Sequence, residues 1–144
     1  MTIVRRNYSE IAPAIGPYSR GIKFGEFLFI SGCTAVGTNH ENGDIIQQTD
    51  VILNRIQKIL QCEGLTMKHI IKVGVFIKDM NGFRDRQSEY NKLIETYFEG
   101  FYPASTLLGG VELALPSMLI EIEAIASLQT CRLQDTCSEN NRSA

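Results

Sequence analysis

The segment "HIIKVGVFIKDM", residues His69 to Met80, is β-branched and almost continuously apolar. Such a run is typical of a strand covered on both faces. Amphipathic helical patterns lie on either side of it. The preceding pattern places one apolar stripe on a helix that Gly64 can end: Thr49, Ile52, Leu53, Ile56, Ile59 and Leu60. The following pattern predicts a second helix that ends at Gly100: Phe83, Gln87, Tyr90, Ile94, Tyr97 and Phe98.

Further strands are indicated on both sides of this unit. Ile22–Phe24 and Phe27–Ser31 are joined by Gly25-Glu26, and a two-residue loop with glycine first suits a type II′ hairpin turn. An extra strand can precede them at Ile3–Arg6, and "STLLGGVELAL" (105–115) and "SMLIEIEAIA" (117–126) follow the second helix. This order predicts an α+β fold, with one mixed sheet and both helices on one face. The other face then lacks a cover, which predicts a homo-oligomer.

Length and composition set the broad class. The 144 residues suit one domain, and 44% hydrophobic with 21% charged residues is ordinary globular composition. The sequence shows neither a membrane-spanning run nor a secretory pattern, so we expect a soluble, cytoplasmic protein. A net charge of −2 argues against a broad nucleic-acid surface. We expect the domain to span residues 1–127, with 128–144 as a flexible polar tail.

Metal and nucleotide sites are not indicated. The four cysteines are scattered without a C-x-x-C pair, and neither a P-loop nor G-x-G-x-x-G occurs. No metal or organic cofactor is therefore expected. Cys62, on a helical pattern, is predicted to be a small buried hydrophobe, and Cys131 and Cys137 are predicted to be exposed thiols.

The last strand carries the first candidate for chemistry. Glu121 and Glu123 alternate with apolar residues and share one face of that strand. A solvated sheet face explains Glu123. For Glu121 two interpretations stay open, a solvated carboxylate or a carboxylate in a partly dry cleft, where a raised pKa would suit it to proton transfer.

Small and hydroxylic residues supply further candidates. Ser31 and Gly32 end a strand, so a ligand could approach the backbone there, although an ordinary strand exit explains them equally. Ser105 and Thr106 follow Pro103, where they could line a cleft or simply start a strand. Neither serine has an obvious His/Asp set, so a serine-hydrolase triad is not expected.

Five ordered motifs carry a resemblance to a known family: "APAIGPYSRGI" (12–22), "FLFISG" (27–32), "VGVFIKDMNGF" (73–83), "YPAST" (102–106) and "LIEIEAIA" (119–126). In order and spacing they resemble the Rid family of YjgF-type reactive intermediate deaminases, from about Ile3 to Ser127. The resemblance implies a chorismate-mutase-like α+β subunit, a homotrimer with ligand clefts between subunits, and hydrolysis of an imine or enamine with release of ammonia.

The resemblance also assigns roles. It implies that Tyr18 closes over the ligand. Tyr18 lies in the N-terminal lead-in, residues 12–22, whose two prolines would fix the wall of the cleft before a ligand binds. Ser31 and Gly32 match the backbone floor of the cleft, and Glu121 matches the carboxylate that positions or activates the attacking water. Gln87 stands where archetypal members carry asparagine.

One departure affects the expected substrate. Imine-hydrolysing members carry Pro-Ala-Arg-Ser, whose arginine clamps the substrate carboxylate, whereas this chain has Pro103-Ala104-Ser105-Thr106. The sequence thus resembles an arginine-lacking subgroup, and we expect a substrate other than a simple 2-imino acid. Arg20 is a candidate stand-in, because in an extended segment it would point the same way as Tyr18; a solvated surface arginine is the alternative.

Three functions follow from these observations. The leading hypothesis is a deaminase in which Glu121 activates water and Ser105, Thr106 or backbone N–H groups stabilise the developing charge. The alternative is a non-catalytic protein that binds a small metabolite in the same cleft. An endoribonuclease is the third hypothesis, and the acidic balance and the absence of a catalytic histidine pair count against it.

Overall fold

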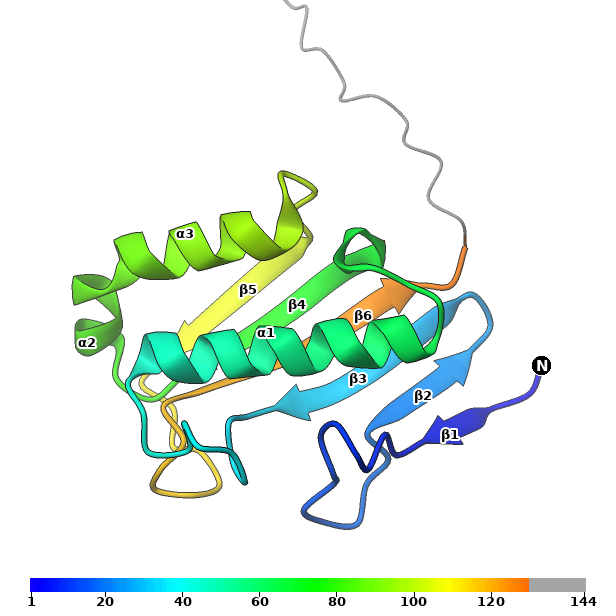
Figure 1. Cartoon of the computed structure of the whole chain (residues 1–144), viewed down its shortest axis with the longest axis horizontal. Helices are drawn as coiled ribbons and strands as arrows, with labels where there is room; N and C mark the ends of the chain where they lie inside the picture. The colour runs from blue at the N-terminus through cyan, green and yellow to red at the C-terminus, as the bar shows by residue number, and fades with distance from the viewer. Residues whose placement is uncertain (130–144) are drawn as a thin grey trace, which may run out of the picture.

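Six strands form one mixed sheet in the order β1-β2-β3-β6-β4-β5 in the computed structural model, which describes residues 1–129 (Figure 1). The strands are β1 (Val4–Arg6), β2 (Gly21–Phe24), β3 (Phe27–Cys33), β4 (Ile70–Ile77), β5 (Ala104–Gly109) and β6 (Ile120–Ser127). The helices are α1 (Ile45–Cys62), the short 3-10 helix η1 (Met67–His69), α2 (Met80–Asp85) and α3 (Gln87–Phe98). β4 and β5 are parallel, and the other neighbouring strands are antiparallel.

The helices cover one face of this sheet, which confirms the α+β prediction (Figure 1). Strand β6 shows why that face is the core side, since its alternate residues are buried beneath α1: Ile120, Ile122, Ala124 and Ala126. Alternation along a strand sends the intervening residues, Glu121 and Glu123 among them, to the helix-free face. The hairpin at Gly25-Glu26 is confirmed as well, and Gly25 takes φ +58°, the conformation that a type II′ turn needs at its first central position.

Helix α1 begins earlier than its apolar stripe does. Asp44 caps it by accepting from the backbone N–H groups of Ile46 and Gln47, while the Gln47 side chain accepts from the Asp44 N–H. This reciprocal capping box satisfies donors that a helix start leaves free. The helix ends at Cys62, and Gly64 follows with φ +72°.

The predicted second helix is divided in two. Arg86, with φ −109° and ψ 7°, leaves helical geometry between α2 and α3. Its guanidinium binds Glu89 in the new helix and lies 3.5 Å from the Asp44 carboxylate. Phe83 and Tyr90 pack edge to face across the break, with ring centroids 4.9 Å apart, so the apolar stripe continues although the helix does not.

The segment predicted as a strand over 105–115 leaves the sheet at Gly109, and Gly110 has φ +72°. Residues 110–119 instead form a loop at one end of the sheet. Gln48 of α1, a buried amide, holds this loop by donating to the Ser117 carbonyl and accepting from the Leu119 N–H, both at 2.9 Å.

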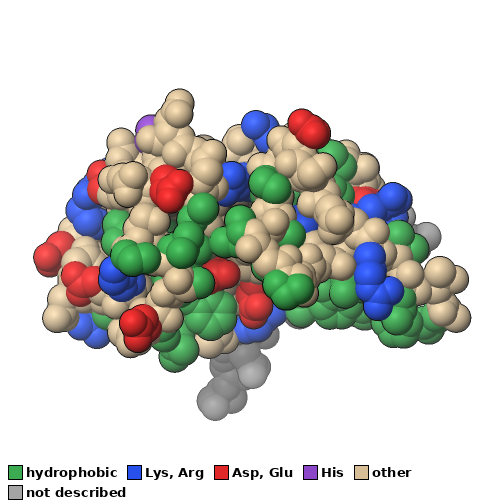
Figure 2. Space-filling model, turned by 90° about the horizontal axis from the view of Figure 1, so that it is seen from below, with side chains coloured by type: hydrophobic (Ala, Val, Ile, Leu, Met, Phe, Trp, Pro, Cys, Tyr) green, Lys and Arg blue, Asp and Glu red, His purple; other side chains and the backbone are tan. Residues whose placement is uncertain are grey.

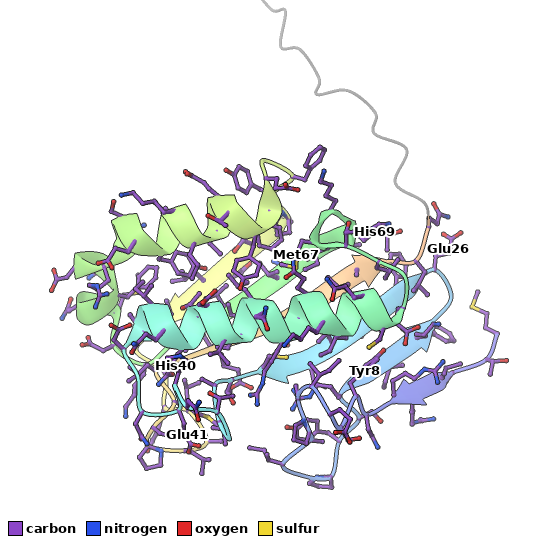
Figure 3. All side chains as sticks on the ribbon, viewed as in Figure 1. Tyr8, Glu26, His40, Glu41, Met67 and His69 are labelled. Carbon is purple, nitrogen blue, oxygen red and sulfur yellow. The ribbon has the colours of Figure 1, made fainter. Side chains whose placement is uncertain are left out.

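The prediction for Cys62 is wrong. Its thiol is exposed at the end of α1, beside the apolar stripe, and Cys33 of β3 is buried instead. The neighbouring Glu63 side chain is the one that turns inward, accepting from Tyr8 and Lys23 at 2.7 Å each (Tyr8 is labelled in Figure 3). Burial alone would raise the pKa of the Glu63 carboxyl, but these donors outweigh it and lower the pKa.

The predicted tail, residues 128–144, lies outside the described residues from residue 130 onward. Leu128 packs against the core, and its N–H donates to the Glu26 carbonyl at 2.8 Å, so the ordered domain includes it. Cys131 and Cys137 lie outside the described residues. Within residues 1–129, no helix is both long and apolar enough to cross a membrane. Over the same residues, no cluster of three or more His, Cys, Asp or Glu could hold a metal ion.

Candidate functional site

A cavity of about 600 Å³ lies at the end of the sheet where three loops meet. Its walls come from the lead-in over residues 13–20, the end of β3 and the segment after it, helix α1, and the loop before β6. Figure 2 views the molecule from this end and shows acidic side chains near its centre, between hydrophobic ones. Five of the predicted site residues line the cavity together, Tyr18, Arg20, Ser31, Gly32 and Glu121, and Glu123 lines it as well.

Glu121 lies in a partly dry environment inside the cavity. It is half-buried on β6, and burial, aided by the nearby Glu123, raises the pKa of its carboxyl group against the opposing influence of Arg20. Across from it lies Gly32, where β3 departs from regular pairing with β6. A Cβ atom at position 32 would lie 2.8 Å from the Glu121 Cδ, so any larger residue there would force this carboxylate to move.

Glu123 has a similar partner but a different environment. A Cβ atom at Gly74, its cross-strand neighbour on β4, would lie 2.7 Å from the Glu123 Oε1. The Glu123 side chain is nevertheless exposed. It therefore matches the solvated interpretation, whereas Glu121 matches the partly dry one.

Arg20 matches neither of the two interpretations drawn from the sequence. It is only 4% exposed, so it is not a solvated surface arginine. Nε donates to the Ala12 carbonyl at 2.7 Å, Nη1 to the Gly32 carbonyl at 2.6 Å, and Nη2 to the Pro13 carbonyl at 3.1 Å. Nη2 also donates to the Tyr18 hydroxyl at 3.2 Å. Because protein acceptors occupy its donors, Arg20 joins the lead-in to β3 and has little left for a ligand.

Tyr18 and Ser31 are fixed by the same junction. The Tyr18 ring lies 5.3 Å from the Arg20 guanidinium carbon, and its hydroxyl also accepts from the Ile15 N–H. The Ser31 hydroxyl donates to the Ser19 carbonyl at 2.7 Å, and its N–H donates to the Arg20 carbonyl. The lead-in is thereby bonded to β3 at several points, with Tyr18 still 41% exposed at the cavity.

Three predicted site residues lie elsewhere in the subunit. Ser105 and Thr106 are on edge strand β5, which β4 separates from β6, and the Thr106 hydroxyl accepts from Lys72 at 2.8 Å. Gln87 is exposed at the start of α3. A single chain therefore does not bring these residues to the cavity.

One residue of the cavity was missed by the sequence analysis. Arg55 of α1 is half-buried and donates from Nη1 to the Thr34 carbonyl and from Nη2 to the Val36 carbonyl, the latter at 3.0 Å. Burial lowers the pKa of its guanidinium, and the neighbouring Arg20 lowers it further. Arg55 falls on the polar side of the helical pattern, where solvation is the ordinary expectation, so helical spacing contains no signal for it.

The two histidines do not join this site. His40 precedes α1 and His69 follows it, so they lie toward opposite ends of that helix (Figure 3). The His69 Nδ1 accepts from the Thr66 N–H at 3.1 Å. Neither histidine lines the cavity that holds Glu121.

Comparisons with known proteins agree with this architecture. The family model described as endoribonuclease L-PSP matches residues 9–128. A RutC family protein of Pyrococcus horikoshii is 42% identical over 125 residues, covering 83% of this chain and 94% of that protein. The 2-iminobutanoate/2-iminopropanoate deaminase of Escherichia coli is 36% identical over 123 residues, covering 82% of this chain and 93% of that enzyme.

Solved structures show the same fold. The crystal structure of the Rid family protein YyfA from Yersinia pestis matches with a TM-score of 0.75 and 32% sequence identity, over 88% of this chain and 99% of that one. Yeast Mmf1 matches with a TM-score of 0.75 and 25% identity, over 88% and 98%. Together with the matched family model, these likenesses confirm the resemblance to the Rid proteins, and the chain belongs to the endoribonuclease L-PSP family.

Proposed function

We propose that this protein is a deaminase that hydrolyses the C=N bond of an imine, or of an enamine after its tautomerisation, and releases ammonia. The observation that carries the proposal is the half-buried Glu121 carboxylate in a cavity of about 600 Å³. A carboxyl group with a raised pKa returns a proton more readily than a solvated carboxyl group and can still accept one when ionised. The relative named 2-iminobutanoate/2-iminopropanoate deaminase supports the same reaction class.

The reaction needs one water molecule and one proton-transfer group. The substrate enters as the protonated imine, and ionised Glu121 accepts a proton from water as the water oxygen bonds to the imine carbon and the C=N π electrons move to nitrogen. Glu121 then returns its proton to the nitrogen of the tetrahedral adduct. The C–N bond breaks, ammonia leaves with the bonding pair, and the hydroxyl proton passes to Glu121 as the carbonyl forms. Release of that proton to solvent balances the one that the protonated imine brought.

A homotrimer would complete the site. The helix-free face of the sheet carries exposed aromatic side chains, with Phe27 40% and Phe29 41% exposed. Hydrophobic side chains lie along the lower margin of Figure 2, where that face is seen edge-on. Burial of such a surface favours association. In the assembly that we propose, Gln87, Ser105 and Thr106 reach the cleft of a neighbouring subunit, where their polar groups stabilise the adduct.

The substrate that we propose is not a simple 2-imino acid, because Ser105 occupies the place of the clamping arginine. A non-catalytic metabolite-binding protein remains the second candidate for the same reason. We do not extend the endoribonuclease description of the family to this chain, since no histidine lines the described cavity.

The direct test is ammonia release from a panel of enzymatically generated imines and enamines, with and without carboxylates. Glu121→Gln should lower turnover by at least 100-fold, in line with removal of a general acid–base group. Glu95→Gln, on exposed α3 and outside the cavity, is the control and should retain activity. Binding without turnover by the wild-type protein would instead favour the metabolite-binding candidate. Equal activity of wild type and Glu121→Gln would contradict the assigned role.

A further inference from the structure

Arg55 is a half-buried cation that has no carboxylate partner among residues 1–129. Its two hydrogen bonds go to the backbone carbonyls of Thr34 and Val36, directly after β3. The ion pairs of the described residues involve other cations: Arg6, Lys23, Lys68 and Arg86. A guanidinium removed from water in this way normally gains a compensating anion.

Several N–H donors of the Arg55 guanidinium have no acceptor among residues 1–129. A guanidinium has five N–H donors, and Arg55 uses one on each terminal nitrogen. Nε–H and the second hydrogens of Nη1 and Nη2 have no acceptor within residues 1–129. Arg20 provides the contrast, because all three of its nitrogens donate to protein oxygens. Arg55 is therefore the arginine of this cavity with donors left for a ligand.

The local field reinforces this inference. Arg20 lies close enough to lower the pKa of Arg55, so two cationic groups lie near each other beside the cavity that contains Glu121. The carboxyl group on the cavity floor, Glu121, is itself shifted toward its neutral form by burial. An anion placed against Arg55 would be attracted by both arginines.

We infer that Arg55 is a specificity-determining residue that binds a carboxylate of the ligand from the helix α1 side of the cavity containing Glu121. A planar guanidinium with adjacent free donors suits a carboxylate. The inference rests on the proposed function only for the C=N chemistry. It deepens that function by naming the substrate class as imines or enamines that carry a carboxylate group, held from α1 and not from β5.

Arg55 also borders a neighbouring cavity of about 560 Å³, which Lys58 lines and which does not contain Glu121. This arrangement supplies a matched control on the same helix. Arg55→Gln removes the charge but keeps an amide donor for the carbonyls of Thr34 and Val36, Arg55→Lys keeps the charge without the fork, and Lys58→Gln removes a charge from the neighbouring cavity alone.

The test is calorimetric binding of two oxo acids that imitate deamination products, 4-oxopentanoate and 5-oxohexanoate, each compared with its uncharged amide. The wild-type protein should bind at least one oxo acid ten-fold or more tightly than its amide. That preference should vanish in Arg55→Gln, persist in part in Arg55→Lys, and stay unchanged in Lys58→Gln. In the wild-type protein, the same oxo acid should shift the NMR resonance of the Arg55 Nε–H but not that of Arg86, a readout that needs no variant to fold.

The outcomes separate this inference from the proposed function. Equal affinity of wild type and Arg55→Gln for the oxo acids, or equal loss in Lys58→Gln, would overturn the role of Arg55. An Arg55 Nε–H resonance that ignores saturating oxo acid would do the same. Arg55-dependent binding in a protein without imine turnover would uphold this inference and reject the deaminase, whereas turnover of uncharged imines alone would do the reverse.

Discussion

Gly32 and Glu121 face each other across β3 and β6 so closely that a Cβ atom on residue 32 would lie 2.8 Å from the Glu121 Cδ. The Gly32 carbonyl also accepts from the buried Arg20 at 2.6 Å. Gly32 therefore leaves space for the Glu121 carboxylate on one side and binds Arg20 of the lead-in on the other. The position of Glu121 depends on the absence of a side chain at residue 32.

Gly32→Ala should displace the Glu121 carboxylate and abolish turnover while the protein stays folded. Because the atoms that the new Cβ meets are the end of the flexible Glu121 side chain, which can turn into the cavity, the cost in unfolding free energy should stay near the lower end of the overpacking range, about 1 kcal/mol, measurable by urea denaturation. A double-mutant cycle with Glu121→Ala tests the cause, because removing the carboxylate should relieve most of the cost of Gly32→Ala. Additive effects of the two substitutions would show that the strain arises elsewhere.

Glu121 should make stability depend on pH in a definite direction. Its pKa is raised in the folded protein above the ordinary value of 4.5, so the folded state binds more protons than the unfolded state just above that pH. Stability contributed by this group therefore falls as pH rises from about 4.5 through the folded pKa. Glu121→Gln should match wild type below that window and exceed it above, as measured by denaturation at stepped pH. A difference between the two proteins that does not vary with pH would contradict the raised pKa.

Arg20→Gln should destabilise the protein and loosen the lead-in. Shortening the side chain leaves the buried Ala12 carbonyl and the carbonyls of Pro13 and Gly32 without their donors, at a cost of about 2–4 kcal/mol. Hydrogen exchange over residues 12–18 should accelerate in the variant. Arg84→Gln, which removes an exposed arginine bonded only to the Asn81 side chain, is the control and should change stability by less than about 0.5 kcal/mol. Wild-type stability in Arg20→Gln would rule out the joining role.

The proposed trimer predicts a particle of three times the 16.1 kDa chain mass in size-exclusion chromatography with light scattering. Phe29→Asp, on the helix-free face of the sheet, should yield monomers, because it places a charge where an apolar contact is expected. Lys92→Asp, on exposed α3, should leave the assembly intact. A wild-type protein that runs as a monomer at tens of micromolar would refute the trimer.

The arrangement of elements could be predicted from the sequence because hydrophobic period is a local property. The apolar run Ile70–Ile77 indicates a strand, and the alternation over Ile120–Ser127 indicates both a strand and which of its faces is buried. The same alternation placed Glu121 off the core, and the Gly25-Glu26 hairpin followed from turn geometry. The break at Arg86 and the early end of β5 at Gly109 could not be predicted in this way, because an Arg86–Asp44 ion pair and a loop held by Gln48 join segments far apart in the sequence.

The fold class, the family and the site candidates Tyr18, Ser31, Gly32 and Glu121 could be identified from local motifs in the sequence. The roles of the two arginines could not, because they depend on contacts between segments that folding brings together. Arg20 is bonded to the protein because the lead-in folds back over it, and Arg55 reaches the cavity because α1 crosses the end of β3. The burial of these two arginines and their hydrogen-bond partners arise when distant segments pack together. The residues next to each arginine in the sequence do not reveal them.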